Sequence, residues 1–203
     1  SDGDTVLASL SINEKVFEFA SEELKSDKAF VMQVIQTDNR VNLSRVIQFA
    51  SDELRGDKDV VMAAASMKAN ALQYVSKELR SDREFMMQVV QAKGGAFLYL
   101  SDKLLKSDKE LVLAAVSNDG RALQYTSEEL RADKAVVMAA VSNNGRAFQY
   151  ASEELRADKE VVEKAIYKHR DALNYASNEF KDSLLDRTVK LERHFDDGYG
   201  TTY

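Results

Sequence analysis

A unit of about 25 residues recurs along this chain, and the repetition constrains the fold more than any other feature of the sequence. Two consecutive copies read ALQYTSEELRADKAVVMAAVSNNGR (122–146) and AFQYASEELRADKEVVEKAIYKHRD (147–171). An aromatic residue marks every unit, and a serine follows two residues later. These aromatic residues, the aromatic column, are Phe19, Phe49, Tyr74, Tyr99, Tyr125, Tyr150 and Tyr175.

The second half of each unit predicts an α-helix of about ten residues, because its apolar residues recur at i, i+1, i+4 and i+5 and so share one helical face. In one copy these residues are Val136, Val137, Ala140 and Val141. Asp133 is suited to cap the start of this helix, and Gly145 to take the left-handed conformation after its end. The absence of proline from the chain agrees with nearly continuous helix.

The first half of each unit shows a second helical pattern, with apolar residues such as Leu123 and Leu130. This helix either continues through Ser127 or restarts there. A restart is favoured, because Ser-Glu-Glu-Leu is a good N-terminal capping sequence and a serine within a helix competes with the backbone for hydrogen bonds.

Isolated helices this short are marginal in water, so neighbouring units must stack around a shared core. We therefore predict an all-α fold, an α-solenoid of about seven repeat units preceded by an N-terminal half-unit. One solenoid domain spans 1–195, with the half-unit at 1–15, and a flexible tail follows at 196–203. The units begin at residues 16, 46, 71, 96, 122, 147 and 172. Because the chain opens within a repeat and without an initiator Met, we expect it to be part of a longer protein.

Charge and composition narrow the class of partner. The chain has 28 Lys and Arg against 34 Asp and Glu, a net charge of −6, which disfavours nucleic acid. No stretch approaches the roughly 18 consecutive apolar residues of a membrane helix, so we expect no membrane insertion. Cysteine is absent, which excludes disulfides and thiolate chemistry. A cytoplasmic setting is the default expectation, and the oligomeric state is left open.

The sequence offers no catalytic constellation. The two histidines, His169 and His194, lack the partners of a metal or acid–base site, and we interpret His169 as a surface side chain. The glycines at the ends of the predicted helices are interpreted as residues that end them. These are Gly94, Gly95, Gly120 and Gly145. No break in the repeat indicates an active site. We therefore predict no enzyme activity, no cofactor and no metal.

Two polar columns are the candidate binding residues. The arginine column is Arg55, Arg80, Arg131 and Arg156, with Lys25, Lys106 and Lys181 in the remaining units. Either it pairs with Glu53, Glu78, Glu129 and Glu154, or it binds an acidic protein segment. The amide column is Gln48, Gln73, Gln124 and Gln149. It either holds an extended peptide or caps neighbouring loops, whereas the aromatic column is expected in the core between repeats.

The string ALQY[AT]SEELRADK[AE]VV, clearest at 122–137 and 147–162, resembles a family of bacteria and protists known as domain of unknown function number four-one-one-six. The resemblance implies tandem helical repeats, often within larger proteins, some of which resemble secreted effectors. It supplies no catalytic or binding residue. We predict a non-enzymatic scaffold or interaction module for a protein or peptide partner. The alternative is a region that recruits targets for an enzyme or effector whose catalytic domain lies outside this chain.

Overall fold

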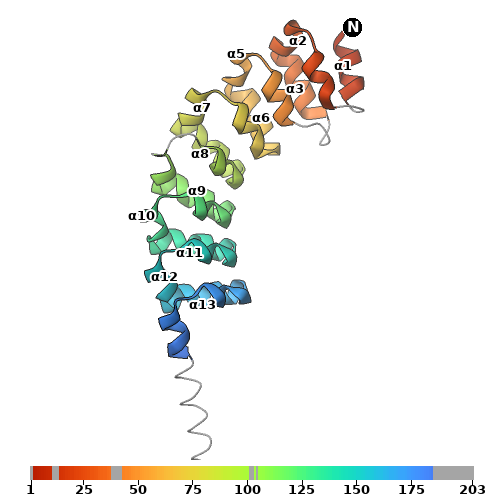
Figure 1. The fold of residues 1–203 in the computed structure, drawn as a ribbon. Helices are drawn as coiled ribbons and strands as arrows, with labels where there is room; N and C mark the ends of the chain where they lie inside the picture. Colours follow the sequence, from red (N-terminus) through yellow and green to blue (C-terminus); the bar gives the residue numbers. More distant parts are fainter. Residues whose placement is uncertain (1, 11–13, 38–42, 101–102, 104, 185–203) are drawn as a thin grey trace, which may run out of the picture.

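The computed structural model describes residues 2–10, 14–37, 43–100, 103 and 105–184. Over these ranges the chain forms helices and no β-strand. The helices stack in chain order into an elongated, curved array, from the N-terminus in red to the last described helix in blue (Figure 1). The predicted all-α solenoid is confirmed. The predicted tail at 196–203 and His194 lie outside the described residues.

A long α-helix from the half-unit and from each of the first six units forms the first layer of the array. Its predicted length is confirmed, since α11 has 10 residues. The half-unit supplies α1 (Asp2–Leu10), and the units supply α3 (Lys28–Thr37), α6 (Lys58–Met67), α8 (Arg83–Ala92), α9 (Lys109–Asn118), α11 (Lys134–Asn143) and α13 (Lys159–Lys168). From α3 onward each long helix packs beside that of the next unit, as α11 does between α9 and α13.

A 3-10 helix in most units forms the second layer. These helices are η1 (Glu14–Phe19), η2 (Ala69–Tyr74), η3 (Gly94–Tyr99), η5 (Gly120–Tyr125), η6 (Gly145–Tyr150) and η7 (Arg170–Tyr175), with the α-helix α4 (Leu43–Phe49) in the corresponding place of one unit. Residues in extended conformation, Asn144 and Ala151, bound η6 at both ends. Neighbouring members such as η5 and η6 pack side by side and against α11.

Short helices complete the units, and they confirm the predicted restart at serine. They are α2 (Glu22–Ser26), α5 (Asp52–Arg55), α7 (Lys77–Ser81), α10 (Glu128–Arg131) and α12 (Glu153–Ala157), with η4 (Leu105–Ser107) in the fourth unit. The Ser152 hydroxyl accepts from the backbone N–H of Leu155 at 3.4 Å. Ser21, Ser51, Ser76 and Ser177 accept in the same way.

The core runs unbroken between the two layers. The predicted apolar face of α11 is fully buried: Val136, Val137, Ala140 and Val141 have no exposed surface. The 3-10 layer contributes one large side chain per unit, such as Leu123 or Phe148, and the short helix adds a leucine such as Leu155. Since each interface buries residues of two units, no unit holds a complete core of its own.

The aromatic column lies at the edge of the core and not inside it, which corrects the sequence-based expectation. Phe19, Tyr125 and Tyr175 are 82%, 37% and 40% exposed. The other members are half-buried and pack against the edge of the core. The residue two positions earlier, for example Phe148 before Tyr150, is the buried one. Aromatic rings therefore reach the surface once per unit.

Gly94, Gly120 and Gly145 serve close packing, so their interpretation as left-handed helix ends is wrong. Asn144 ends α11 in an extended conformation, with φ −142° and ψ 106°, and Gly145 then begins η6. A Cβ atom on Gly145 would lie 2.9 Å from the Ala165 carbonyl oxygen of the next unit, and one on Gly120 would lie 2.4 Å from that of Ala140. Here the backbone of one unit touches the next, which leaves no room for a side chain.

We expect Leu155→Ala to lower the free energy of unfolding by about 2–5 kcal/mol, because it removes a leucine that is 8% exposed from a shared interface. Chemical denaturation followed by circular dichroism measures the change. A loss below about 1 kcal/mol would contradict the packing described for the short helices.

We expect Gly120→Ala to destabilise the array by about 1–3 kcal/mol, because the new Cβ would press on the Ala140 carbonyl. Gly95→Ala is the matched control. A Cβ on Gly95 meets only Asp119 Oδ2, at 3.8 Å, so its stability should stay the same or rise by up to about 1 kcal/mol. Equal losses in both variants, measured by thermal and urea unfolding, would contradict this account of the glycines.

Candidate partner-binding surface

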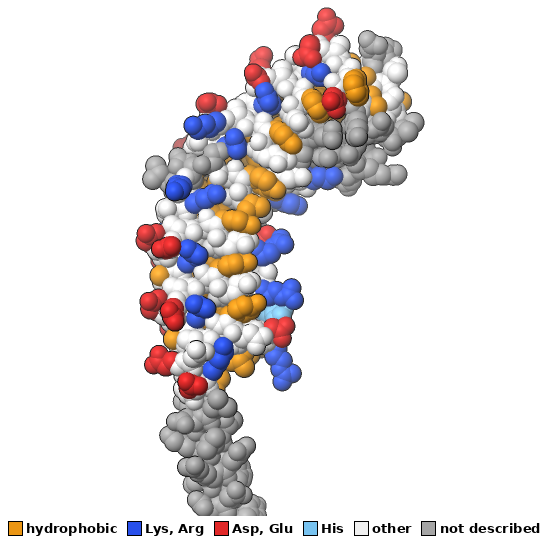
Figure 2. Space-filling view, viewed as in Figure 1, with side chains coloured by type: hydrophobic (Ala, Val, Ile, Leu, Met, Phe, Trp, Pro, Cys, Tyr) orange, Lys and Arg blue, Asp and Glu red, His pale blue; other side chains and the backbone are white. Residues whose placement is uncertain are grey.

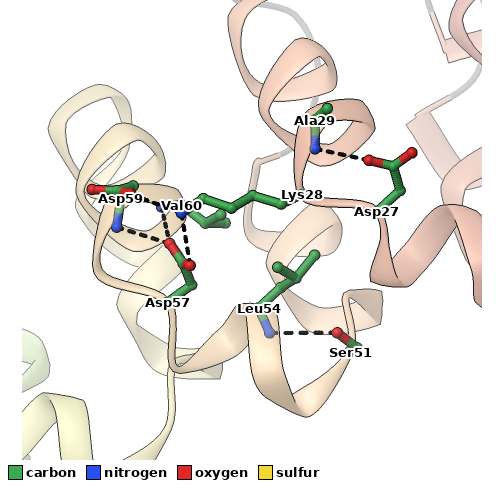
Figure 3. A network of polar contacts seen from close by, with 8 residues as sticks. All are labelled: Asp27, Lys28, Ala29, Ser51, Leu54, Asp57, Asp59 and Val60. Carbon is green, nitrogen blue, oxygen red and sulfur yellow. Dashed lines mark hydrogen bonds and ion pairs between the residues drawn. The ribbon is translucent and has the colours of Figure 1, made fainter.

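The lysine or arginine that directly follows the capping aspartate forms an ion pair with the next unit. Lys28 Nζ lies 2.8 Å from Asp57 Oδ2 and 2.7 Å from Asp59 Oδ2 of the next unit (Figure 3). The other oxygen of Asp57 accepts from the backbone N–H groups of Asp59 and Val60, so the carboxylate caps α6 while it holds the preceding unit. One aspartate thus serves two structural purposes.

Four further contacts repeat this arrangement, and we call the set the capping ladder. Its other pairs are Lys58–Asp82 (2.7 Å), Arg83–Asp108 (2.5 Å), Lys109–Asp133 (2.5 Å) and Lys134–Asp158 (2.8 Å). The hydrogen bond from Lys109 holds the pKa of Asp133 below its usual value. These cations pair with the capping aspartates of the next unit, and they are therefore structural.

Two more sets of hydrogen bonds cross between units. The backbone N–H of Ser152 donates to the Arg131 carbonyl at 2.9 Å, and the bond recurs from Ser177 to Arg156. At the other end of the long helices, Asn143 Nδ2 donates to the Ser117 carbonyl at 2.9 Å, while its Oδ1 accepts from the N–H of Gly120. The backbone of the arginine column is thus a structural element.

Among the described residues, the side chains of the arginine column form ion pairs only within their own units. Arg131 Nη2 lies 3.7 Å from Glu128 Oε1, and Arg55 pairs with Asp52, in each case three residues earlier in the same helix. Among the residues that the structure describes, Arg80 and Arg156 form no ion pair. The Nε atoms of Arg80, Arg131 and Arg156 are buried and lack a hydrogen-bond partner there.

The ion pairs expected between the arginine column and Glu53, Glu78, Glu129 and Glu154 are not the observed ones. Glu154 is held at the start of α12, where its own backbone N–H and the Ser152 hydroxyl donate to its carboxylate and lower its pKa. The pKa of Glu129 is also lowered, because its own backbone N–H donates to its carboxylate. These carboxylates stabilise the helix start, which leaves the arginine heads available.

The amide column stands one residue before the aromatic column in the sequence. Gln149 Nε2 donates to the Arg146 carbonyl of its own 3-10 helix at 3.1 Å. Gln73 is exposed, whereas Gln48 and Gln124 are half-buried. Leucine takes this place once, at Leu98, which is 38% exposed. The peptide-binding role of these amides stays a prediction.

Aromatic and basic side chains share a surface. Arg131, Tyr150 and Arg156 line one hollow of about 300 Å³, together with Glu128 and Glu153. Figure 2 shows rows of acidic, basic and hydrophobic side chains running along the array beside one another. The sequence reveals the columns, but it places the aromatic column in the core and so misses this surface.

A second hollow, of about 240 Å³, interrupts the regular surface in the middle of the array. It lies on the 3-10 layer, where η3 meets η5. Its lining comprises Ala69, Gly94, Gly95, Leu98, Tyr99, Asp119, Arg121, Ala122, Gln124 and Tyr125. Two of these, Gly95 and Leu98, stand where other units carry arginine and glutamine. This departure from the repeat is a sequence signal for the hollow.

His169 lies between the fifth and sixth units and is not a plain surface residue. Its Nε2 accepts from Arg146 Nε at 2.8 Å, and its Nδ1 lies 3.8 Å from the Asp171 carboxylate. In the described part of the chain, no cluster of three His, Asp or Glu side chains is placed to hold a metal ion. The helices described here are all too short or too polar to cross a membrane.

The repeat geometry agrees with the comparison to known families. A model for the domain of unknown function DUF4116 matches the chain five times, over residues 2–44, 41–80, 57–106, 82–131 and 133–181. The chain belongs to the DUF4116 family. No curated protein and no solved structure matches it. The DUF4116 matches confirm the tandem repeat and assign no activity to its surface.

We expect Lys109 and Asp133 to be coupled in stability. Lys109→Met should cost no more than about 1 kcal/mol, because the pair is partly exposed. Asp133→Ala should cost about 0.5–2 kcal/mol, because it also removes the cap of α11. A double-mutant cycle should give a coupling energy of about 0.2–1 kcal/mol. Lys159→Met is the control, since Ser183 replaces the next aspartate there.

This coupling should depend on pH in one direction. The folded pKa of Asp133 is lowered, so its contribution is complete above the unfolded pKa of about 3.9 and is lost as the pH falls through the folded value. Urea unfolding at a series of pH values measures the loss. A coupling energy that persists at about pH 2 would contradict an ion pair.

Proposed function

We propose that this chain is a non-enzymatic scaffold that binds an acidic, extended segment of a partner protein along the arginine and aromatic columns. The observation that carries the proposal is the contrast between the two basic columns. The capping ladder is engaged by the next unit, whereas Arg80 and Arg156 have no ion-pair partner among the described residues and Arg131 has only a long one.

The aromatic column supports the same surface. Tyr150 lines a hollow together with Arg131 and Arg156, so a bound segment would meet both rings and guanidinium groups. Tyr and Arg are enriched among the residues that dominate binding energy at protein interfaces. Arginine presents a planar fork that matches a carboxylate with two hydrogen bonds.

The repeat spacing sets the kind of segment that fits. Packed helices lie about 8–10 Å apart, and an extended chain advances about 3.3–3.6 Å per residue. One unit therefore corresponds to about two to three residues of an extended peptide. A carboxylate at every third position would meet successive members of the arginine column.

Target recruitment for an enzyme or secreted effector is the alternative role. It would use the same surface, because recruitment also requires a partner to be held along the array. The sequence of the full-length protein distinguishes the two roles, since a catalytic domain beside the repeats would favour recruitment.

The test uses a labelled twelve-residue peptide with glutamate at every third position and neutral residues elsewhere. The combined variant Arg80→Ala, Arg131→Ala and Arg156→Ala should bind it about 10- to 100-fold more weakly in fluorescence anisotropy, because three charge contacts are lost. Binding to the unaltered chain should weaken steeply with added salt.

The matched control removes three exposed cations outside the arginine column, through Lys159→Ala, Lys168→Ala and Arg170→Ala. It lowers the net charge by the same amount and should keep most of the affinity. Circular dichroism verifies that both variants fold. Equal affinity losses in the two triple variants, or none in either, would exclude the arginine column as the binding surface.

A further inference from the structure

We propose that the hollow between η3 and η5 binds one large apolar side chain of the acidic segment and so fixes where that segment sits along the array. The inference rests on the proposed function and deepens it, because it adds an anchor to an otherwise periodic surface. A uniform repeat binds a uniform peptide equally well in several registers, whereas one apolar cavity admits one of them.

The two glycines of η3, Gly94 and Gly95, differ in the space that surrounds them. A Cβ on Gly94 would lie 2.6 Å from the Cβ of Asn118 and 2.8 Å from the backbone nitrogen of Asp119, so the fold excludes any side chain there. A Cβ on Gly95 would meet only Asp119 Oδ2, at 3.8 Å. Packing therefore explains Gly94 and does not explain Gly95.

Arginine fills the equivalent place in the next two units. Arg121 and Arg146 follow Gly120 and Gly145 as Gly95 follows Gly94. Arg121 pairs with Asp119 and is 71% exposed, so a long side chain is accommodated at this position without burial. Its absence at Gly95 leaves the surface open beside Leu98 and Tyr99.

The lining of the hollow is apolar at the centre and polar at the rim. Leu98 replaces the amide of other units, and it stands with Tyr99 and Tyr125 around the opening left by Gly95. Leu98 and Tyr125 remain 38% and 37% exposed, so apolar surface is available for burial by a partner. Gln124 and the Arg121–Asp119 pair supply polar groups at its edge.

Charge complementarity identifies the occupant as part of an acidic segment. Arg131 and Tyr150 line one hollow, and Arg80 stands at the same repeat position relative to Tyr99 as Arg131 does relative to Tyr150. Arg80 has no ion pair within the described residues, and its own helix offers Lys77 three residues earlier instead of an acid. An apolar residue flanked by glutamates would therefore fill the cavity and bring carboxylates to a cation that has no ion pair among the described residues.

The test uses the twelve-residue acidic peptide with either leucine or alanine as its central residue. The unaltered chain should bind the leucine peptide about tenfold more tightly, because the leucine buries more apolar surface. Gly95→Arg and Leu98→Gln restore the residues that other units carry, and each should reduce this preference to about twofold or less. Asn70→Arg places the same charge at the equivalent position one unit earlier, outside the lining, and should retain the preference.

The outcomes separate the cavity from the arginine column. The triple arginine variant should weaken binding of both peptides and keep the leucine preference. A second peptide pair with glutamine in place of glutamate should bind at lower affinity and still show the leucine preference. That preference would support the cavity independently of the charge contacts. Equal binding of leucine and alanine peptides by the unaltered chain, or an undiminished preference in both Gly95→Arg and Leu98→Gln, would overturn the proposal.

Discussion

The structure depends on burial of the apolar face of the long helices, such as the valine and alanine face of α11, against neighbouring units. A ten-residue helix is marginal in water by itself, and full burial of a valine stabilises it by about 1.5–3 kcal/mol relative to exposure. Val136 and Val137 of α11 reach full burial because α9 and α13 lie on either side and η5 and η6 pack against the same helix. Every other feature of the array is compatible with this contact: the glycines permit close approach, and the short helices close the edge of the core.

Polar contacts then fix how the units are placed. Asp133 caps α11 and receives Lys109 of the preceding unit, and Asn143 ties the far end of the same helix to the unit before it. Each contact is individually weak, but the set recurs along the array and specifies one offset between neighbours. The stacking contacts therefore use the cations of the capping ladder and the backbone of the arginine column, and the arginine heads are not required for them.

Prediction from the sequence is correct for features that recur in every unit, and it is wrong where contacts with the neighbouring unit determine the structure. The valine face, the Asp133 cap and the restart at serine follow from residue types within one unit, and the structure confirms them. The role of Gly145 does not follow, because only the position of Ala165 in the next unit shows that a Cβ has no room. Tyr150 is misplaced for a related reason: Phe148 fills the core position, and spacing alone does not distinguish two large residues on adjoining faces. The cavity at Gly95 is visible in the sequence only as a departure from the consensus.

We propose that the cations of this solenoid divide into a set that stacks units and a set that binds a partner. Nuclear magnetic resonance of the side chains during titration with the acidic peptide measures this division. We expect progressive shifts of the Nε–H signals of Arg80, Arg131 and Arg156, while the signals of Lys109 and Lys134 stay in place. Shifts confined to those lysines, or no shift at any of the three arginines at saturating peptide, would contradict it.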